Sequence, residues 1–331
     1  MRATVVIPCY RPDEHFEKVL SDLNAQTSQD FEVIFADDGN DPPLKPRIDA
    51  VLRRPFQVIR FETNQGIVAG LNACVQAVTT PYIIRMDADD RMPADRIARQ
   101  IQFLDLHTEV DVVGANMVVF GSKIRLWSKP TGAAKIRAGL LWGPTLNHPT
   151  VAARTEILKR FPYPDSYPLG EDYALWVTLV ANGVSVRNDS SVNLFYRLGQ
   201  QNTSQTNHAE RSRRYAALHR HATNTLLADA DISSLTPGLD NGAHLLLSGI
   251  NPGHLTPTMV DVDLHAQSLM AVLRELKSLD SNPSWVDEAM VETEKRRQRV
   301  LGNKRLHKLQ DVWDLRKMTF TDWKFLFLQC R

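Results

Sequence analysis

Two hydrophobic periods alternate along the first 120 residues of this 331-residue chain, and few folds accommodate that alternation. Short apolar runs rich in β-branched residues predict strands at 4–8, 31–36, 57–61, 82–86 and 110–119. Between them, helical spacing of apolar residues predicts helices at 16–23, 66–78 and 93–106. Strands that alternate with helices predict an α/β protein with a mostly parallel central sheet flanked by helices.

The pattern changes near residue 205. No strand pattern follows, and helical faces recur at 269–279, 306–313 and 320–327, while the Gly/Pro/Asn-rich segment 235–257 indicates a loop. We therefore predict an α/β domain at 1–205 and a helical C-terminal region at 206–331.

Composition excludes several classes of protein. A hydrophobic content of 43% and a formal charge of +1 exclude a wholly disordered chain. Three cysteines, Cys9, Cys74 and Cys330, do not make a disulfide framework, so we expect a reducing compartment. We see no signal peptide and no apolar run long enough to span a bilayer, and we expect a cytoplasmic protein.

The strongest local signal is a run of carboxylates after the fourth predicted strand. Asp87, Asp89 and Asp90 lie within four residues and repel one another unless a partner offsets their charge. Hard oxygen ligands suit Mg²⁺ or Mn²⁺, which often bridge to substrate phosphates. The alternative is a solvated acidic turn.

Weaker signals follow the second and third strands. Asp37 and Asp38 can accept hydrogen bonds from a ribose or a base, or can simply form an Asx turn. Asn64 and Gly66 open the next helix, but the segment lacks the G-x-G-x-x-G fingerprint of dinucleotide-binding proteins, which disfavours a nicotinamide dehydrogenase.

Further signals lie in the second half of the α/β region. Glu171 and Asp172 fall in the first turn of an amphipathic helix, where the helix dipole favours ionised carboxylates, and such a carboxylate can act as a general base. His148 and Arg197 lie in short polar segments, and each taken alone is compatible with a structural role.

Taken in order, these segments resemble the family 2 glycosyltransferases over residues 3–204. The matching segments are VVIPCYRP, ADDGN, NQGIVAGLN, IRMDADDR, NHPTV, GEDYALW and FYR. The resemblance implies the GT-A fold of nucleotide-diphospho-sugar transferases and an inverting reaction of the bacterial polysaccharide type.

The resemblance also implies a nucleotide site. It places Pro8, Tyr10 and Arg11 beside uracil or another base, and has Asp38 hold the nucleoside with Asp37 next to it. The nucleotide-binding residues that it implies are Pro8, Tyr10, Arg11, Asp37, Asp38, Asn64, Gly66, Asp87, His148 and Arg197.

The catalytic roles come from the same resemblance. Asp87 faces the ribose and donor sugar, Asp89 with Asp87 binds the metal, Asp172 is the general base and Glu171 shapes the acceptor pocket. Many relatives have a histidine where this chain has Gly199, so the second protein ligand of the metal is left open.

The implied activity is transfer from a nucleotide-sugar, with a UDP-sugar as first candidate, to a hydroxyl of a glycan or lipid-linked saccharide. Two alternatives remain. A sugar nucleotidyltransferase normally carries a glycine-rich loop after its first strand, and residues 9–13 contain no glycine. A non-catalytic nucleotide-sugar-binding module would not need both Asp89 and Asp172.

The last 37 residues are strongly basic. Residues 295–331 hold eleven Lys/Arg against three Asp/Glu, with five large aromatic residues interleaved after residue 312. We expect no nucleic-acid partner, since no nucleic-acid-binding module is recognisable there. The composition predicts either an interfacial helix at the inner face of the cytoplasmic membrane or a helix packed on the catalytic domain with a solvated basic face.

Overall fold

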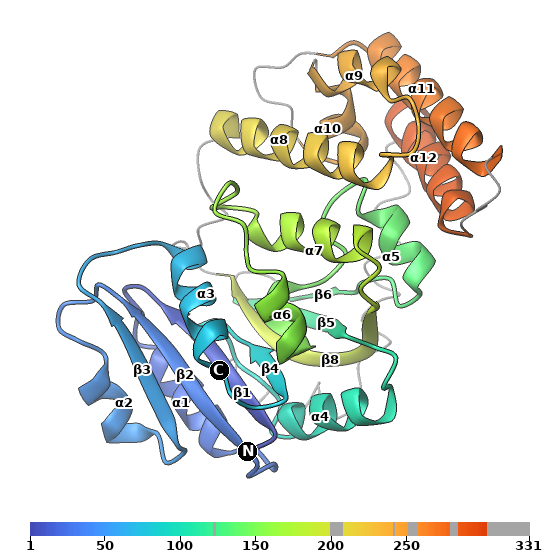
Figure 1. The fold of residues 1–331 in the computed structure, drawn as a ribbon. Coiled ribbons are helices and arrows are strands. Elements are labelled where there is room, and N and C mark those ends of the chain that lie inside the picture. The colour runs from blue at the N-terminus through green and yellow to red at the C-terminus, as the bar shows by residue number, and fades with distance from the viewer. Residues whose placement is uncertain (122–123, 199–207, 241, 251–256, 279–283, 303–331) are drawn as a thin grey trace.

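The computed structural model describes residues 1–331 except 122–123, 199–207, 241, 251–256, 279–283 and 303–331 (Figure 1). Its centre is an eight-stranded sheet in the order β3-β2-β1-β4-β7-β5-β6, with β8 also paired to β5. The strands are β1 (Ala3–Cys9), β2 (Phe31–Asp38), β3 (Phe56–Phe61), β4 (Tyr82–Arg85), β5 (Val112–Gly121), β6 (Arg125–Trp127), β7 (Ala152–Arg154) and β8 (Val186–Leu198).

Parallel pairing joins the predicted strands β1, β2, β3 and β4, and it also joins β5 to β8, a strand that the sequence does not predict. β1 pairs in parallel with β2 and β4, β2 with β3, and β5 with β8. The sheet is nevertheless mixed, because β7 runs antiparallel to β4 and β5, and β6 antiparallel to β5. β6 and β7 have three residues each, too few to show a period of two in the sequence, and they were not predicted.

Helices cover both faces of the sheet. α1 (Phe16–Asn24), α2 (Lys45–Val51) and α4 (Arg96–Leu106) pack on one face, and α3 (Ile67–Ala77), α5 (Ala133–Gly139), α6 (Thr155–Arg160) and α7 (Glu171–Ala181) on the other. The predicted face of α1 is confirmed, since Phe16, Val19, Leu20 and Leu23 are all fully buried. Each such side chain contributes about 1.5–3 kcal/mol through burial.

The C-terminal helices lie above α5 and α7 in Figure 1. They are α8 (His208–Leu226), the 3₁₀ turn Ser233–Leu235, α9 (Thr236–Asp240), α10 (Ala243–Leu247), α11 (Met259–Ser278) and α12 (Ser284–Gly302). Leu218 of α8 and Leu273 of α11 share one buried cluster with Trp176 of α7. The division at residue 205 stays a prediction.

The expectation of a loop over 235–257 is wrong for its first half. α9 and α10 lie there, and they bury Leu239, Leu245 and Leu247. Each helix has only five residues, so glycines and prolines around them hide the helical spacing. The predicted faces at 306–313 and 320–327, and most of the basic tail, lie outside the described residues.

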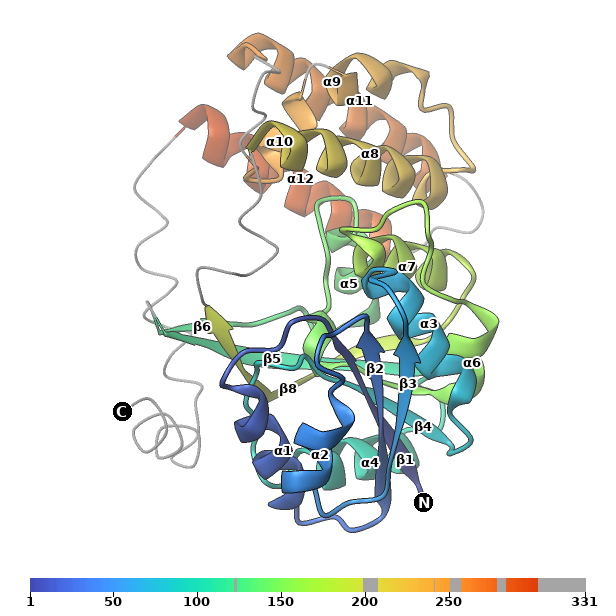
Figure 2. The same ribbon diagram turned by 90° about the vertical axis from the view of Figure 1, so that its left-hand side faces the viewer.

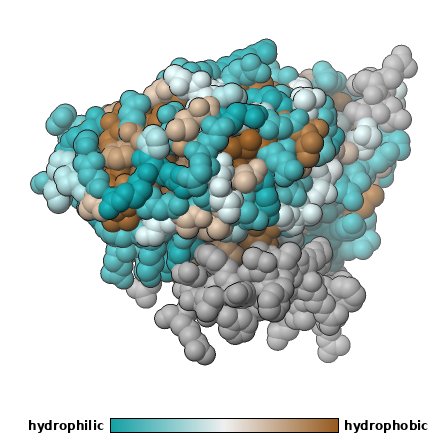
Figure 3. Space-filling view, turned by 90° about the horizontal axis from the view of Figure 1, so that it is seen from below, coloured by the Kyte–Doolittle hydropathy of each residue, from teal (hydrophilic) through white to brown (hydrophobic). Residues whose placement is uncertain are grey.

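Within the described ranges, no helix combines the length and the hydrophobicity needed to cross a membrane. The face seen in Figure 3 is largely hydrophilic, with hydrophobic residues in small groups between polar ones. Figure 2 shows β2 and β3 ending on the side where α5 and α7 lie, so the carboxyl ends of the parallel strands face these helices. Ligands bind at this edge in open α/β sheets.

Candidate active site

Asp38, at the end of β2, gathers two of the other predicted residues around its carboxylate. It accepts hydrogen bonds from Asn64 Nδ2 at 2.9 Å, from the backbone N–H of Gln65 at 2.6 Å and from that of Gly66 at 3.0 Å. Gly66 is the N-cap of α3 and has φ +87°, a conformation that glycine adopts without strain. Asp38, Asn64 and Gly66 therefore form one hydrogen-bonded unit.

Asp37 has a different environment, although it is the neighbouring residue. Its carboxylate is fully buried and accepts hydrogen bonds from Asn40 Nδ2 at 2.7 Å, Leu44 N at 3.0 Å and Arg60 Nη1 at 2.8 Å. Burial alone would raise the pKa of Asp37, but these hydrogen bonds outweigh it and lower the pKa. Asp37 thus shapes the loop after β2, and its oxygens are occupied by protein donors.

Pro8 near the end of β1, and Tyr10 and Arg11 directly after it, lie at the same edge. Pro8 pairs with Ala36 of β2, and Tyr10 is half exposed. Arg11 has φ +48° and stacks its guanidinium over the Tyr10 ring at 5.0 Å, while its backbone N–H donates to Asn40 Oδ1. A non-glycine residue in this left-handed region costs about 1 kcal/mol. The aromatic ring of Tyr10 is thus available at the rim of the edge.

The carboxylates after β4 have unequal environments. Asp87 pairs with Arg85 Nη2 at 2.7 Å. Burial, together with the charges of Asp87 and Asp13, raises the pKa of Asp89 to about 6. Asp90 is fully buried, and it accepts the backbone N–H of Arg197 at 2.9 Å. Asp87 and Asp89 are thus partly exposed, whereas the buried Asp90 joins the loop after β4 to β8.

Arg197 lies over this acidic loop. Its Nε donates to the backbone oxygen of Asp89 at 3.2 Å, and its guanidinium stacks over the Phe120 ring at 4.7 Å. The predicted Arg197 and Asp89 are therefore adjacent. Gly199, which stands where many relatives have a histidine, lies outside the described residues.

Glu171 and Asp172 begin α7, as predicted. Glu171 accepts the N–H of Gly170 at 3.0 Å, and Asp172 accepts the N–H of Tyr173 at 2.7 Å. Burial and the neighbouring Asp172 raise the pKa of Glu171 to about 7. Burial also raises the pKa of Asp172, and the nearby cations Arg85 and Lys129 oppose that rise. Paired carboxylates with shifted pKa values are typical of acid–base sites.

His148 completes the predicted set. It starts the 3₁₀ turn His148–Thr150, with Nδ1 3.7 Å from Glu171 and Nε2 2.9 Å from the Tyr163 hydroxyl. Burial lowers the pKa of His148 well below its usual value, so the ring is neutral at pH 7. Its contact with Glu171 is therefore a polar contact with a neutral imidazole.

Two cations in this site were not predicted. Arg85, 3% exposed, is the last residue of β4, and its Nε and Nη1 have no hydrogen-bond partner in the part of the chain that is described. Lys129 donates from Nζ to Pro144 O at 2.7 Å, and burial lowers its pKa to about 8 despite the charge of Asp172. In the sequence, Arg85 stands out as a charged residue at the end of an apolar strand, and this pattern indicates a functional residue. No sequence pattern marks Lys129.

A divalent cation is compatible with this donor set. Across the described ranges, no three His, Cys, Asp or Glu side chains converge on a metal position. Mg²⁺ and Mn²⁺ commonly take one or two carboxylates and complete their shell with water and substrate phosphates. Asp89 fits best: burial and the charges of Asp87 and Asp13 raise its pKa, and a cation would offset that charge repulsion, whereas Asp87 is already paired with Arg85.

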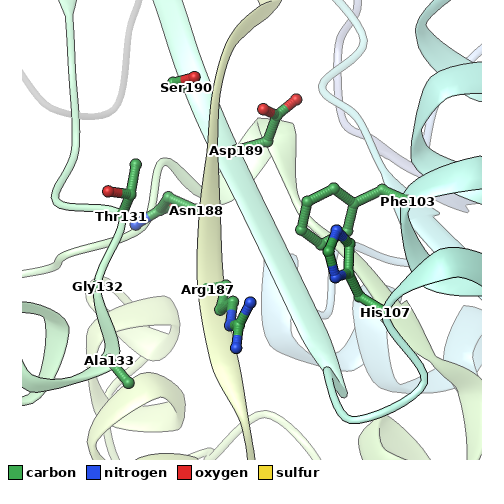
Figure 4. Close-up of a pocket in the computed structure, with 9 residues that line it drawn as sticks. All are labelled: Phe103, His107, Thr131, Gly132, Ala133, Arg187, Asn188, Asp189 and Ser190. Carbon is green, nitrogen blue, oxygen red and sulfur yellow. The ribbon is translucent and has the colours of Figure 1, made fainter.

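A hollow of about 510 Å³ lies elsewhere, between α4, the start of β8 and the segment before α5 (Figure 4). Arg187, His107 and Asn188 are among its lining residues. None of the predicted site residues lines it. The candidate active site is thus the carboxylate-rich edge, and this hollow is separate from it.

Comparison with known proteins shows the fold and a family to which part of the chain is similar. Residues 4–161 match the model of glycosyl transferase family 2. An uncharacterised glycosyltransferase of Haemophilus influenzae is 26% identical over 60% of this chain and 77% of its own length. The amylovoran biosynthesis glycosyltransferase AmsE of Erwinia amylovora is 28% identical over 59% and 76%.

A third relative is UDP-Glc:alpha-D-GlcNAc-diphosphoundecaprenol beta-1,3-glucosyltransferase WfaP of Escherichia coli, 24% identical over 59% of this chain and 76% of its own. Among solved structures, S. aureus TarS 1–349 with UDP-GlcNAc superposes with a TM-score of 0.58 at 16% identity, over 90% and 92% of the two chains. The mannosyltransferase PcManGT of Pyrobaculum calidifontis, solved with GDP-Man and Mn²⁺, gives 0.53 at 16% identity, over 92% and 88%. Residues 4–161 of this chain are thus similar to glycosyl transferase family 2, and the protein is a glycosyltransferase with the GT-A fold.

Proposed function

We propose that this enzyme transfers a sugar from a nucleotide-sugar to a hydroxyl of a glycan or lipid-linked saccharide, with inversion at the anomeric carbon. The observation that carries the proposal is the position of buried Arg85. It binds Asp87 at 2.7 Å and also interacts electrostatically with Glu171 and Asp172. The carboxylates expected to hold the donor and those expected to activate the acceptor therefore share one buried cation.

The donor that we propose is a UDP-sugar. WfaP is named for UDP-Glc and for a diphosphoundecaprenol acceptor, and TarS was solved with UDP-GlcNAc. PcManGT was solved with GDP-Man, so the fold accommodates another nucleotide as well. In this chain, Asp38 with Asn64 and Gly66 would bind the nucleoside, and the exposed ring of Tyr10 would stack on the base.

The reaction is a single displacement. The acceptor oxygen forms a bond to the anomeric carbon while the bond to the diphosphate oxygen breaks, and Asp172 takes the hydroxyl proton. Nucleoside diphosphate leaves with the electron pair, so an α-linked donor yields a β-linked product. Asp172 must be ionised to accept the proton, and Arg85 and Lys129 both favour that form. General-base catalysis of this kind is worth about 10²–10⁴-fold.

We propose that Mn²⁺ or Mg²⁺ is required, with Asp89 and Asp87 as its protein ligands. A bound divalent cation would offset the charge that develops on the departing diphosphate. Around that position, Arg197 holds the backbone of Asp89, and Asp90 anchors the loop to β8. These contacts keep the acidic loop in place.

A thermal-shift panel tests the donor. Native-state ligands raise the melting temperature according to their affinity. We expect UDP and UDP-sugars with Mn²⁺ to stabilise the protein more than GDP, ADP and their sugars, and we expect a chelator to remove the effect. A larger shift with another nucleotide would identify that nucleotide, instead of UDP, as the one carried by the donor. No shift with any nucleotide would refute a nucleotide-sugar site.

Two assays separate the alternatives. A sugar nucleotidyltransferase would release pyrophosphate from a nucleoside triphosphate and a sugar phosphate. A pure binding module would not hydrolyse its bound donor. We expect slow, metal-dependent hydrolysis of the donor and no pyrophosphate release.

Peripheral contact with the membrane is a sequence-based proposal. The basic, aromatic residues after 312 favour anionic lipid surfaces, at about 1 kcal/mol per cation near the surface. Full-length protein should sediment with phosphatidylglycerol vesicles, and K317E/K324E should weaken that binding. Equal sedimentation of both proteins would contradict membrane contact through the tail.

A further inference from the structure

The C-terminal helices contact the catalytic part of the chain beside Asp172, at the N-terminal end of α7. Gly170, the N-cap of α7, has φ +132°, and a Cβ atom built there would lie 2.4 Å from Leu218 Cδ1 of α8. Leu218 is 2% exposed. Its side chain therefore occupies the space that a side chain at position 170 would need, and it packs directly against the backbone that leads into the two carboxylates.

A second contact holds Tyr173, the residue that follows Asp172 in the first turn of α7. Tyr173 donates its hydroxyl to Leu140 O at 2.5 Å, and His219 Nδ1 of α8 lies 3.4 Å from that hydroxyl. Both side chains are fully buried. The N–H of Tyr173 is the donor to Asp172 Oδ1. Tyr173 thus uses its hydroxyl to bind Leu140 and its backbone N–H to bind Asp172, so the packing that holds its ring also fixes the donor to Asp172.

A third contact holds residues 141–142, which follow α5. His244 of α10 has Nε2 2.7 Å from Leu141 O and stacks on the Trp142 ring with centroids 4.7 Å apart. His265 of α11 supports it through a 2.8 Å contact between His244 Nδ1 and His265 Nε2. Two residues after Trp142, Pro144 accepts the hydrogen bond from Lys129 Nζ. The helices therefore hold both the base and the segment that fixes its neighbouring cation.

These histidines act as neutral packing groups. Burial lowers the pKa of His244 to about 4 and that of His265 to about 3, and it lowers the pKa of His219 well below its usual value. Neutral rings can share hydrogen bonds with backbone oxygens and with each other without placing charge in the interface. The contacts are therefore in place at neutral pH.

We infer that Leu218, His219, His244 and His265, here called the clamp, are positioning residues that fix Asp172 for proton transfer. The C-terminal helices would then serve catalysis without touching substrate. This inference rests on the proposed function, which makes Asp172 the base. A shift of about 1 Å in a reacting group can lower the rate about 100-fold, so a change in the packing at Gly170 can lower the turnover rate.

The test compares two leucines of the helical region. L218A empties the contact with Gly170, and L269A removes a side chain buried on α11 that is outside the clamp. The probes are UDP-glucose and UDP-N-acetylglucosamine with Mn²⁺, and the readouts are kcat and KM for hydrolysis, UDP affinity by calorimetry, and hydrogen exchange of peptides covering 168–176. We expect L218A to lower kcat by about tenfold or more, with donor KM and UDP affinity nearly unchanged and faster exchange at 170–174.

L269A should lower the melting temperature but leave kcat and exchange at 170–174 near those of the wild type. L218M, which refills the space, should recover most of the kcat. Y173F removes only the hydroxyl anchor, and it serves if L218A does not fold; we expect it to lower kcat with unchanged UDP affinity. Equal loss of kcat in L218A and L269A, or a Y173F enzyme with normal kcat, would overturn the inference. Absence of hydrolysis in the wild type would instead refute the proposed function, and the exchange comparison would still report on the clamp.

Discussion

The two halves of the site satisfy their carboxylates in different ways. In the donor half, formed by the loops after β1, β2 and β3, protein N–H groups saturate Asp37 and surround Asp38. In the acceptor half, formed by the first turn of α7 and residues 128–148, Glu171 and Asp172 are buried beside cations and accept hydrogen bonds from backbone N–H groups. Hydrogen bonds dominate the first half, and charges dominate the second.

This difference agrees with the function proposed for each half, which is nucleotide binding for the donor half and proton transfer for the acceptor half. A nucleotide has to be bound in a fixed geometry, and preformed hydrogen bonds provide that geometry. A general base has to change protonation state during turnover, and a raised pKa brings the pKa of a carboxylate closer to pH 7. Substitutions in the donor half should therefore alter binding or stability, while substitutions in the acceptor half should alter rate and pH dependence.

The largest effect should come from D172N. An amide cannot accept the proton, so we expect transfer and donor hydrolysis to fall by about 10²–10⁴-fold. UDP affinity, measured by calorimetry, should stay within about twofold, because binding depends on the other half. D111N, which alters a carboxylate that binds Ser185 N, is the matched control and should keep its rate. A D172N enzyme with near-normal turnover would remove Asp172 from the role of base.

The converse should hold for D38N. Its amide group would turn N–H donors towards Asn64 and the backbone N–H groups that now donate to the carboxylate. Hydrogen bonds to a charged group are worth about 1.5–3 kcal/mol each. We expect UDP affinity to fall by about 10–100-fold, with kcat at saturating donor nearly unchanged. D49N, which removes an exposed carboxylate on α2, should have no effect on either. If D38N lowers kcat and leaves affinity intact, the comparison between the halves fails.

A smaller effect, visible mainly as pH dependence, should follow K129M. The Lys129 cation opposes the rise in the pKa of Asp172, so its removal raises that pKa further. The base is inactive when protonated, so activity is lost as pH falls through this pKa. The acid limb of kcat/KM should therefore move to higher pH, by about one unit, which means about a tenfold loss on that limb.

K129R keeps the charge and should keep the acid limb near its wild-type position. The Lys129 pKa of about 8 adds a second expectation for the wild type, since the cation is lost as pH rises above 8. Kinetics of donor hydrolysis between pH 5 and 9 would measure both. An unshifted acid limb in K129M would show that Lys129 does not set the ionisation of Asp172.

The same two halves differ in how far the sequence reveals them. Strand ends are local features, so the apolar runs and the Asp-rich turns that follow them indicated Asp38, Asp87 and Asp89 as residues at strand ends. Short β6 and β7 left no such pattern, because three residues that alternate once resemble any loop. Their antiparallel pairing, which sets the direction of the segment towards Lys129, depends on contacts between distant parts of the chain.

Burial explains the remaining differences. Arg85 stands out in the sequence as a charge in an apolar strand, yet its interactions with both Asp87 and Glu171 appear only when β4 and α7 are packed together. The clamp is less visible still, because its residues lie on three separate helices, α8, α10 and α11, and α10 has only five residues. Residues whose function depends on one long-range contact are the ones that sequence patterns miss.

The smallest effect on turnover should come from D37N, although it lies next to Asp38. Asp37 accepts hydrogen bonds from Asn40, Leu44 and Arg60, and the loss of these bonds to a buried carboxylate should destabilise the fold by about 1–3 kcal/mol. Because the folded pKa of Asp37 is lowered, its contribution is complete above the unfolded pKa of about 3.9 and is lost as pH falls through the folded value. Urea unfolding should therefore show a gap between wild type and D37N that is constant from pH 7 to 5 and narrows below pH 4, while kcat of the folded variant and its UDP affinity stay near normal. A D37N protein of wild-type stability but lost UDP affinity would mean that this carboxylate binds nucleotide, and that the division of labour between the two aspartates is the reverse of the one argued from their contacts.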